Sequence, residues 1–291
     1  MKKATISRRE FLGRAAAVGL VSAASGPLAA NEKEPDWLPT TGAGIPLVDY
    51  HVHVDKPATL EQVLAISRQR GVKFGIVEHA GTKANKYPRI LSSDEELKGY
   101  LAELEGKPVF KGVQAEWLDW MTCFSKEMIA KLDYVLTDAM TLRGKDGKPV
   151  RMWDAGFKVG DVQDFMDRYV DFHVELMSLE PIDILANPTY LPGSIAKDYD
   201  ALWTPARMQK IIDAAVKYGI AIEINAGYRI PRLALLKQAK AAGAKFSFGT
   251  NIRGPNVGKL DYCLEMVKAL GLTRADIFTP APPGKKPIER R

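Results

Sequence analysis

Residues 47–54 read Leu-Val-Asp-Tyr-His-Val-His-Val. The β-branched and aromatic residues of this stretch are typical of a buried strand, and its histidines lie toward the carboxyl end. From here onward one pattern recurs: a short apolar run ends in a polar residue, and an amphipathic segment of helical period follows. Residues 47–54 are therefore predicted to be the first of a series of strand-then-helix units.

The series contains seven units. The predicted strands span residues 47–54, 74–79, 109–117, 134–140, 184–190, 220–227 and 245–252. The predicted helices span residues 59–70, 93–105, 125–131, 162–178, 205–218, 231–242 and 257–270. This alternation predicts an α/β fold, a closed or nearly closed TIM-like barrel, with an open doubly wound sheet as the alternative. No Gly-x-Gly-x-x-Gly follows the first strand, so nothing favours dinucleotide binding.

The first 30 residues resemble a bacterial twin-arginine export signal. Arg8 and Arg9 precede a stretch rich in Ala, Val and Leu, and Ala29 and Ala30 are small residues suited to cleavage. An uncleaved membrane anchor is the alternative, although roughly 15 apolar residues are few for a span of about 20. We predict a periplasmic or secreted protein with no stable membrane span after processing. Its predicted parts are a signal peptide (1–30), a linker (31–46), a barrel domain (47–279) and a loose, basic, Pro-rich tail (280–291).

The formal net charge of +6 comes from the two ends of the chain. Residues 1–30 carry +4 and residues 285–291 carry +3, so the body between them is close to neutral. Nucleic acid is therefore not an expected partner. The expected partner is a small-molecule substrate, and an anionic one is among the candidates. Nothing in the sequence indicates an oligomeric state. Cys123 and Cys263 lack the spacing of metal ligands and are better explained as buried thiols than as a disulfide, although export would permit one.

Polar side chains lie at the carboxyl end of every predicted strand, or directly after it. They are His51, His53, Glu78, His79, Glu116, Asp138, Asn187, Glu223, Asn225, Asn251 and Arg253. In a barrel of parallel strands the carboxyl ends share one face, so these groups are expected to converge. His51 and His53 are two positions apart, which directs both imidazoles to the same side of a strand. Converging buried carboxylates and imidazoles are costly unless paired, so we predict a bound cation, although His-x-His alone would be weak support.

Seven motifs in chain order carry a family resemblance. They are Val-Asp-Tyr-His-Val-His (48–53), Gly-Ile-Val-Glu-His (75–79), Gly-Val-Gln-Ala-Glu (112–116), Asp-Tyr-Val-Leu (133–136), Ile-Leu-Ala-Asn-Pro (184–188), Ile-Glu-Ile-Asn (222–225) and Phe-Gly-Thr-Asn (248–251). Together they resemble the polymerase-and-histidinol-phosphatase (PHP) family. The resemblance implies a distorted seven-stranded barrel that hydrolyses phosphate esters with two or three divalent ions. It also implies that His51, His53 and Glu116 hold a first ion, that His79 holds a second, and that Glu116 bridges them.

The chain departs from the family pattern at several positions. Asn187, Asn251 and Arg253 stand where the family usually has His, Asp and His, and Asp138 is the substitute nearest to a fourth-strand His. Asn is a poor ligand for zinc-like ions. We therefore predict one well-formed site for zinc, manganese or iron, and a second only if Asp138 or Asp55 contributes. Arg253 is predicted either to hold a phosphate or carboxylate of the ligand or to form an ion pair within the protein.

A divalent ion held by imidazoles and a carboxylate can activate water for hydrolysis. We expect the general base to be an uncoordinated carboxylate, with Asp138 the first choice and Glu78 and Glu223 behind it. Glu78 would otherwise orient a ligand histidine, and Glu223 would otherwise neutralise an arginine. Asp138, Arg253 and Glu223 are thus the predicted catalytic residues.

Residues outside this set have two interpretations each. Trp117, Trp120, Trp153 and Tyr190 either line a substrate site or simply pack in the barrel. His173, in the predicted helix 162–178, is expected at the surface or in an interface. Basic residues near strand ends are candidate anion contacts, namely Lys56, Lys83, Arg143 and Arg151.

Three hypotheses for function follow. The first is an exported metal-dependent hydrolase that acts on a phosphoester or a related small molecule. The second is an amidohydrolase-like enzyme that cleaves a C–N or C–O bond, since those enzymes also have His-x-His on a first barrel strand. The third is a non-catalytic protein that keeps a metal ion and binds a small ligand, which the residues at positions 187, 251 and 253 would favour.

Overall fold

A computed structural model describes residues 38–54, 58–144, 147–282 and 285–288 of the chain. The predicted signal peptide and residues 31–37 of the predicted linker lie outside the described residues, as do Asp55 and Lys56. Among the helices that are described, none combines the length and the hydropathy that crossing a membrane requires.

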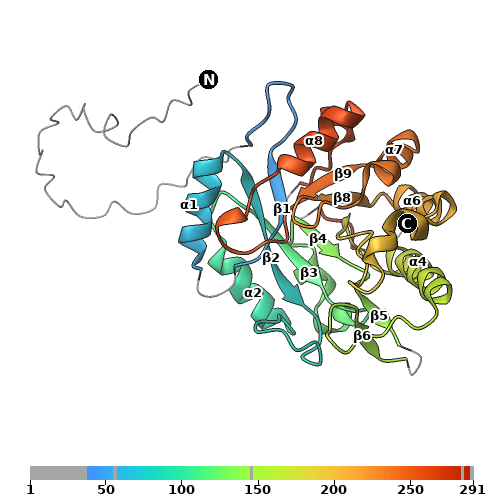
Figure 1. The fold of residues 1–291 in the computed structure, drawn as a ribbon. Coiled ribbons are helices and arrows are strands. Elements are labelled where there is room, and N and C mark those ends of the chain that lie inside the picture. Colours follow the sequence, from blue (N-terminus) through green and yellow to red (C-terminus); the bar gives the residue numbers. More distant parts are fainter. Residues whose placement is uncertain (1–37, 55–57, 145–146, 283–284, 289–291) are drawn as a thin grey trace, which may run out of the picture. The chain divides into compact units, whose positions relative to one another are not determined.

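Seven parallel strands form the main sheet, in the order β1-β2-β3-β4-β7-β8-β9 (Figure 1). They are β1 (Val48–Val52), β2 (Lys73–Ala80), β3 (Phe110–Ala115), β4 (Tyr134–Thr137), β7 (Ile184–Leu185), β8 (Ala221–Asn225) and β9 (Phe246–Gly249). A doubly wound sheet would reverse its strand order near the middle, whereas this order follows the chain throughout. The strands are nearly closed into a distorted barrel, so the predicted fold class is confirmed and the open-sheet alternative is wrong.

The first and last strands lie side by side and close the barrel. The backbone N–H of Asn251 donates to the carbonyl oxygen of His51 at 3.0 Å. Below this bond, the fully buried Asp49 carboxylate accepts from the backbone N–H and hydroxyl of Thr250, at 3.0 and 2.6 Å, and from the N–H of Gly258 at 3.0 Å. One side chain thus satisfies the backbone where the sheet ladder is interrupted.

Helices cover the outside of the barrel (Figure 1). They are α1 (Leu60–Arg70), α2 (Asp94–Glu103), α3 (Lys126–Ile129), α4 (Val162–Leu179), α5 (Tyr199–Leu202), α6 (Pro205–Tyr218), α7 (Leu233–Ala241) and α8 (Asp261–Leu270). Helix α6 begins as its sequence predicts, because the Thr204 hydroxyl accepts from the N–H of Arg207 and Pro205 needs no partner in the first turn. Helix α8 starts four residues later than predicted, after a 3₁₀ turn and Gly258.

Several observed strands end before their predicted carboxyl ends, at points where the chain turns into the barrel mouth. Strand β7 ends at Leu185, because Asn187 adopts a left-handed backbone conformation with φ of 45°. The segment after β4 leaves the sheet and forms a hairpin of β5 (Thr141–Arg143) and β6 (Pro149–Arg151). The expected insertion over one face of the barrel is therefore a two-stranded hairpin.

An irregularity in β1 directs its histidines into the barrel. Asp49 is paired with Phe74 of β2, but Val52 is paired with Ile76, so three steps on β1 match two on β2. A bulge of this kind reverses the alternation of side chains along the strand. Tyr50 consequently packs in the lower barrel interior with Tyr134, whose hydroxyl donates to the carbonyl oxygen of Tyr50 at 2.7 Å, while His51 and His53 contact the upper interior.

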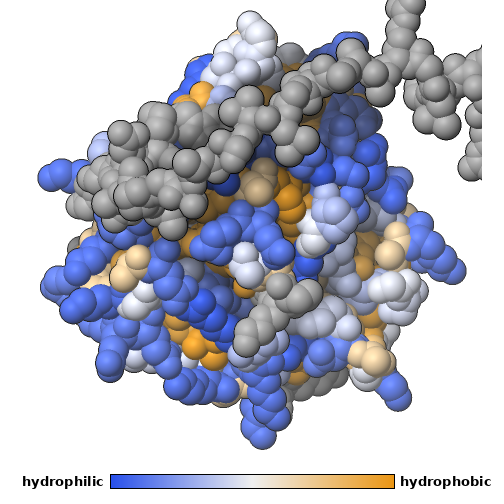
Figure 2. All heavy atoms as spheres, turned by 90° about the vertical axis from the view of Figure 1, so that its left-hand side faces the viewer, coloured by the Kyte–Doolittle hydropathy of each residue, from blue (hydrophilic) through white to orange (hydrophobic). Residues whose placement is uncertain are grey.

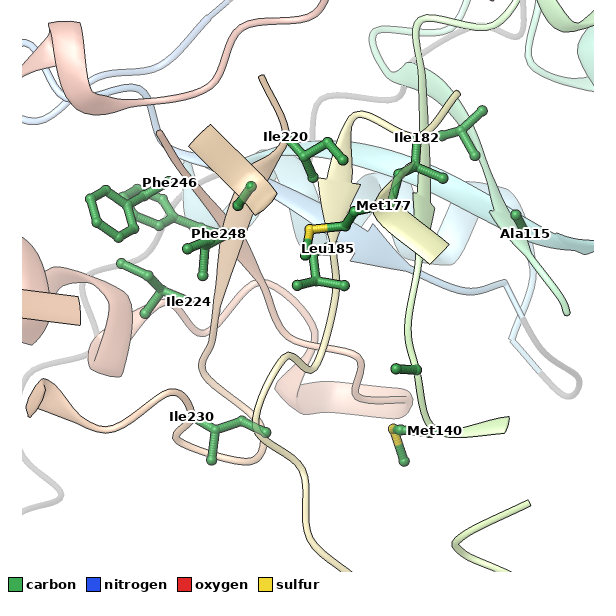
Figure 3. Packing of buried hydrophobic residues seen from close by; sticks show 14 of the residues in the cluster. Ala115, Met140, Met177, Ile182, Leu185, Ile220, Ile224, Ile230, Phe246 and Phe248 are labelled. Carbon is green, nitrogen blue, oxygen red and sulfur yellow. The ribbon is translucent and has the colours of Figure 1, made fainter. Parts of the chain in front are cut away.

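Apolar side chains fill the space between the strands and the helices. Phe246, Phe248 and Ile224 come from β8 and β9, and Leu185 of β7 packs with Met177 of α4 (Figure 3). The face on which α1 lies is mostly hydrophilic, with only scattered apolar residues (Figure 2). Most of the apolar core therefore lies between the barrel and the helices, a smaller cluster that includes Tyr50 and Tyr134 fills the lower barrel interior, and polar groups lie at the barrel mouth.

Two sequence predictions about peripheral residues are wrong. His173 is fully buried in α4, where its Nδ1–H donates to the carbonyl oxygen of Tyr169 at 2.7 Å, so it is not a surface residue. The tail is not loose at Lys286, whose ammonium is buried and donates to the Asp183 carboxylate at 2.6 Å. The position of His173 could not be read from the sequence pattern of α4, because the apolar face of this helix is wide enough to include an imidazole.

Burial of His173 predicts acid sensitivity. Desolvation by burial lowers the pKa of His173 to about 4, whereas an unfolded chain titrates near 6.5. A proton therefore binds the unfolded state first, and the stabilising contribution present above pH 6.5 is lost as the pH falls toward 4. We expect the unfolding free energy to fall by roughly 3 kcal/mol from this group. His173→Phe should remove that part of the pH dependence. Urea titrations of both proteins at pH 7.0 and 4.5, with chelator present, measure the unfolding free energies. If the unfolding free energy fell equally in the wild type and in His173→Phe, His173 would not be the cause.

Candidate metal centre

The predicted polar residues do meet at one end of the barrel. A pocket of about 220 Å³ opens there between the ends of the strands and the β5–β6 hairpin. It is lined by His53, His79, Tyr87, Gln114, Asp138, Met140, Trp153, Tyr228, Asn251 and Arg253. His51 and Glu116 are buried and contact residues of this lining, and the buried Glu223 contacts His51.

Gln114 lies at the centre of the polar residues. Its Oε1 is 3.1 Å from Nε2 of His51 and 3.0 Å from Nε2 of His53. Its Nε2 donates to Oδ2 of Asp138 at 3.4 Å, which orients the amide with its oxygen toward the two imidazoles. An amide oxygen only accepts hydrogen bonds, so both histidines must present an N–H at Nε2.

His51 is held on both of its ring nitrogens. Its Nδ1–H donates to Oε1 of Glu223 at 2.8 Å, and its Nε2–H donates to Gln114. Burial works against a charged imidazole, but the Glu223 carboxylate prevails and raises the pKa of His51. The pair fits only because residue 249 is glycine: a Cβ there would come within 2.0 Å of Oε1 of Glu223.

His53 differs from His51 in having one free ring nitrogen. With its Nε2–H directed at Gln114, the lone pair is on Nδ1, which is buried and has no hydrogen-bond partner in the described part of the chain. Desolvation by burial, together with the neighbouring His79 and His51, holds the pKa of His53 well below its usual range. A neutral imidazole with an unpartnered lone pair is the form that binds metal ions.

His79 is oriented by a carboxylate. Its Nδ1–H donates to Oε1 of Glu116 at 2.7 Å, and the other oxygen of Glu116 accepts from the hydroxyl of Tyr87 at 2.9 Å. The Tyr87 ring also stacks on the His79 ring, with 3.7 Å between centroids. This arrangement fixes the imidazole plane and leaves Nε2 of His79 as the ligand atom, as in many carboxylate–histidine pairs beside metal ions.

One group of side chains could hold an ion. His53, Glu78 and His79 each offer a ligand atom, and these three atoms lie within 4.8 Å of one another. All three residues are buried, and the rings of His53 and His79 are stacked at 4.6 Å. Two imidazoles and one carboxylate are a donor set of catalytic zinc sites, which keep a further position open for water.

Asp138 connects the centre to the ends of β7 and β8. Its Oδ2 accepts from the side-chain amide of Asn187 at 3.1 Å, and Asn187 accepts in turn from the amide of Asn225 at 2.9 Å. Burial, with a contribution from the Glu116 charge, raises the pKa of Asp138 to about 6. Asn187 and Asn251 both have positive φ, 45° and 46°, which Asn tolerates better than most residues.

The sequence-predicted residues therefore have different surroundings. His53, His79, Asp138 and Arg253 line the pocket, and Glu78 joins the group able to hold an ion. The atoms of His51, Glu116 and Glu223 instead make hydrogen bonds within the protein. The assignment of His51, Glu116 and Asp138 as ligands stays a prediction, and so do the catalytic roles of Asp138, Arg253 and Glu223.

Most of the tryptophans, basic residues and cysteines considered from the sequence lie outside the pocket or pack against other side chains. Trp120 is fully buried and its indole N–H donates to Glu180, and Trp117 stacks on Phe172. Trp153 does line the pocket. Lys83 and Arg143 form exposed ion pairs with Glu96 and Glu175, whereas Arg151 lies over the Tyr87 ring. Cys123 and Cys263 are free thiols.

Two residues of the centre were missed by the sequence analysis. Gln114 was part of a motif but carried no charge, so it was not considered as a contact of the histidines. Tyr87 lies in the Lys-Tyr-Pro segment 86–88, which has no periodicity to mark it. Only the alternation along β3, which places positions 114 and 116 on the same side as the β1 histidines, could have indicated Gln114.

Comparison with solved structures supports this description of the fold. The chain matches the histidinol phosphate phosphatase of Lactococcus lactis, solved with zinc, L-histidinol and phosphate, with a TM-score of 0.57. The match covers 82% of this chain and 97% of the phosphatase, at 15% sequence identity. Neither the models of protein families nor the curated proteins give a match. The likeness establishes a shared distorted barrel fold.

Proposed function

We propose that the protein is a metal-dependent hydrolase that cleaves small phosphate esters. The observation that carries the proposal is that buried His53, whose Nδ1 has no hydrogen-bond partner among the described residues, offers a ligand atom within 4.8 Å of ligand atoms of Glu78 and His79. A buried polar atom left without a partner is costly, and a cation would satisfy it. The shared fold with a zinc-containing phosphatase adds support.

The donor set fits a divalent ion such as zinc, manganese or iron. His53, Glu78 and His79 would hold it, and the Glu116–Tyr87 pair would keep His79 in its ligand tautomer. When bound, the ion would lower the pKa of a water molecule and offset negative charge on the ester. One ion per chain is the expected content.

The residues around the pocket would perform the remaining work. Arg253, at the end of β9, has the planar fork that suits a phosphate group. Asp138 would take the proton released by the attacking water, because it lines the pocket and Gln114 and Asn187 fix its carboxylate. Glu223 would not contact the substrate and would orient His51 through their hydrogen bond.

A second candidate function is a non-catalytic binding protein. It is favoured by Gln114, whose neutral amide already pairs with both β1 histidines and leaves only His53 with an open nitrogen. A C–N or C–O hydrolase with the same centre is the remaining enzymatic alternative. We further propose export to the periplasm or the medium, on the strength of the twin-arginine motif in the sequence.

The deciding experiment measures metal content and turnover on the same sample. Protein from its native host compartment, never exposed to chelator, is analysed for zinc, manganese and iron, and is assayed with phosphate esters, carboxylic esters, lactones and amides. About one ion per chain with turnover of phosphate esters supports the proposal. Metal without turnover on any substrate favours the binding protein, and turnover of amides or lactones alone favours the other hydrolase.

A further inference from the structure

A larger pocket lies beside the candidate metal centre. Its volume is about 580 Å³, against about 220 Å³ for the pocket over the histidines. The loops after β7 and β8 and helix α8 provide its lining, which includes four tyrosines: Tyr190, Tyr199, Tyr228 and Tyr262. Tyr228 lines both pockets, so the two are adjacent.

The loop that carries Tyr228 is held rigidly. Asn225 and Ile230 exchange two backbone hydrogen bonds, at 2.7 and 3.2 Å, and so close a loop of residues 225–230. The side chain of Asn225 accepts from the N–H of Tyr228 at 2.9 Å and donates to Glu223, which ties the loop to the barrel mouth. Gly227 permits the close approach, since a Cβ there would lie 2.2 Å from the carbonyl oxygen of Thr250.

The position of Tyr228 is thus set by the same network that orients His51 and Asp138. Its ring meets that of Tyr190 edge to face, with 5.4 Å between centroids. Tyr228 is 48% exposed, and an aromatic side chain on a rigid loop, paired with the partly buried Tyr190, offers apolar contact area without a large loss of side-chain entropy.

The charges of this pocket are already paired. Arg229 binds Glu265 at 2.8 Å, and its guanidinium lies over the Tyr262 ring at 4.6 Å. Arg232 binds Asp200 at 2.6 Å and lies over the Tyr199 ring at 4.3 Å. The buried hydroxyl of Tyr262 is likewise satisfied, by the carbonyl oxygen of Pro231 at 2.6 Å. An occupant would therefore meet apolar and aromatic surface with no uncompensated charge.

We propose that this pocket binds the uncharged, ring-bearing alcohol portion of the substrate whose phosphate lies over His53 and Arg253. This inference rests on the proposed function. Pockets for drug-sized ligands span about 300–1,000 Å³, so the larger pocket suits a ring system and the smaller one suits a phosphate group. In the reaction, the ester P–O bond breaks, water supplies OH to phosphorus, and its other proton goes to the alcohol oxygen.

The first test is binding, which does not depend on turnover. 1-Naphthol is titrated into the metal-containing protein and followed by its fluorescence, with Tyr228→Ala, Tyr190→Ala and the conservative Tyr228→Phe alongside. Loss of one aromatic wall should weaken binding about tenfold, while Tyr228→Phe retains it. Tyr218→Ala, at the end of α6 and outside both pockets, is the matched control and should bind as the wild type does.

The second test is selectivity. The ratio of kcat/KM for 1-naphthyl phosphate to kcat/KM for methyl phosphate should fall about tenfold in Tyr190→Ala and stay unchanged in Tyr218→Ala. Naphthol binding that is insensitive to Tyr190 and Tyr228 would overturn the inference. Failure of all phosphate esters to turn over, with naphthol binding still lost in Tyr228→Ala, would instead refute the proposed function and leave the ring site standing.

Discussion

His53→Ala is expected to empty the metal centre and to reduce phosphate ester turnover by about 10³-fold or more. The substitution removes the imidazole of His53, whose buried Nδ1 has no hydrogen-bond partner among the described residues and which lines the pocket. It leaves Glu78 and His79, and two ligands do not make a site of catalytic type. Elemental analysis after gel filtration measures the ion, and initial rates with an aryl phosphate measure turnover.

A matched control separates this effect from a general loss of a buried histidine. His173→Phe also removes a buried imidazole, but from α4, outside the pocket. It should keep the ion and the activity at neutral pH. If His53→Ala retained the full metal content, the ligand set would be wrong. If it lost the ion while turnover persisted, the proposed function would be wrong.

The architecture could be predicted from local patterns. Each strand-then-helix unit repeats the pattern of residues 47–54, and parallel strands joined in this way place their carboxyl ends together. Local signals such as Thr204-Pro205 and the glycine at 219 fixed the bounds of α6. The placement of His53, His79 and Asp138 at one end of the barrel follows from topology alone, without any knowledge of side-chain contacts.

The pairing of those residues could not be predicted in the same way. Two imidazoles at positions i and i+2 indicate a shared face, but the bulge in β1 decides that this face is the barrel interior. Whether His51 is a ligand depends on two residues distant in sequence, Gln114 and Glu223, which take its nitrogens. Periodicity indicates which face of a strand a residue occupies, but it does not say which atoms pair across strands that are not neighbours in the chain.

Gln114→Glu is expected to bind divalent ions at least about tenfold more tightly than the wild type and to make His51 a ligand. In the wild type, a neutral oxygen accepts an N–H from each β1 histidine, so these nitrogens keep their protons. A carboxylate at the same place adds the charge that favours a cation, and the cation can then displace both protons. Metal titration by calorimetry, with and without a competing chelator, measures the change.

The same substitution should destabilise the metal-free protein. It would bring a second carboxylate to the position from which the Gln114 amide now donates to Asp138 at 3.4 Å. Two buried carboxylates at that distance repel each other unless a cation or a proton lies between them. We therefore expect the melting temperature of Gln114→Glu to lie below that of the wild type in chelator and to rise more steeply when metal is added.

A double-mutant comparison with His51→Ala tests whether the ion in Gln114→Glu binds to His51 or is attracted only by the added negative charge. In the wild type, His51→Ala should change metal affinity little, since both nitrogens of His51 are engaged within the protein. In the Gln114→Glu background the same change should cost most of the gained affinity. Gln114→Met, which lacks the oxygen, should gain nothing. Additive effects of the two substitutions would mean that His51 never becomes a ligand, and that its pairing with Glu223 is too strong for an ion to replace.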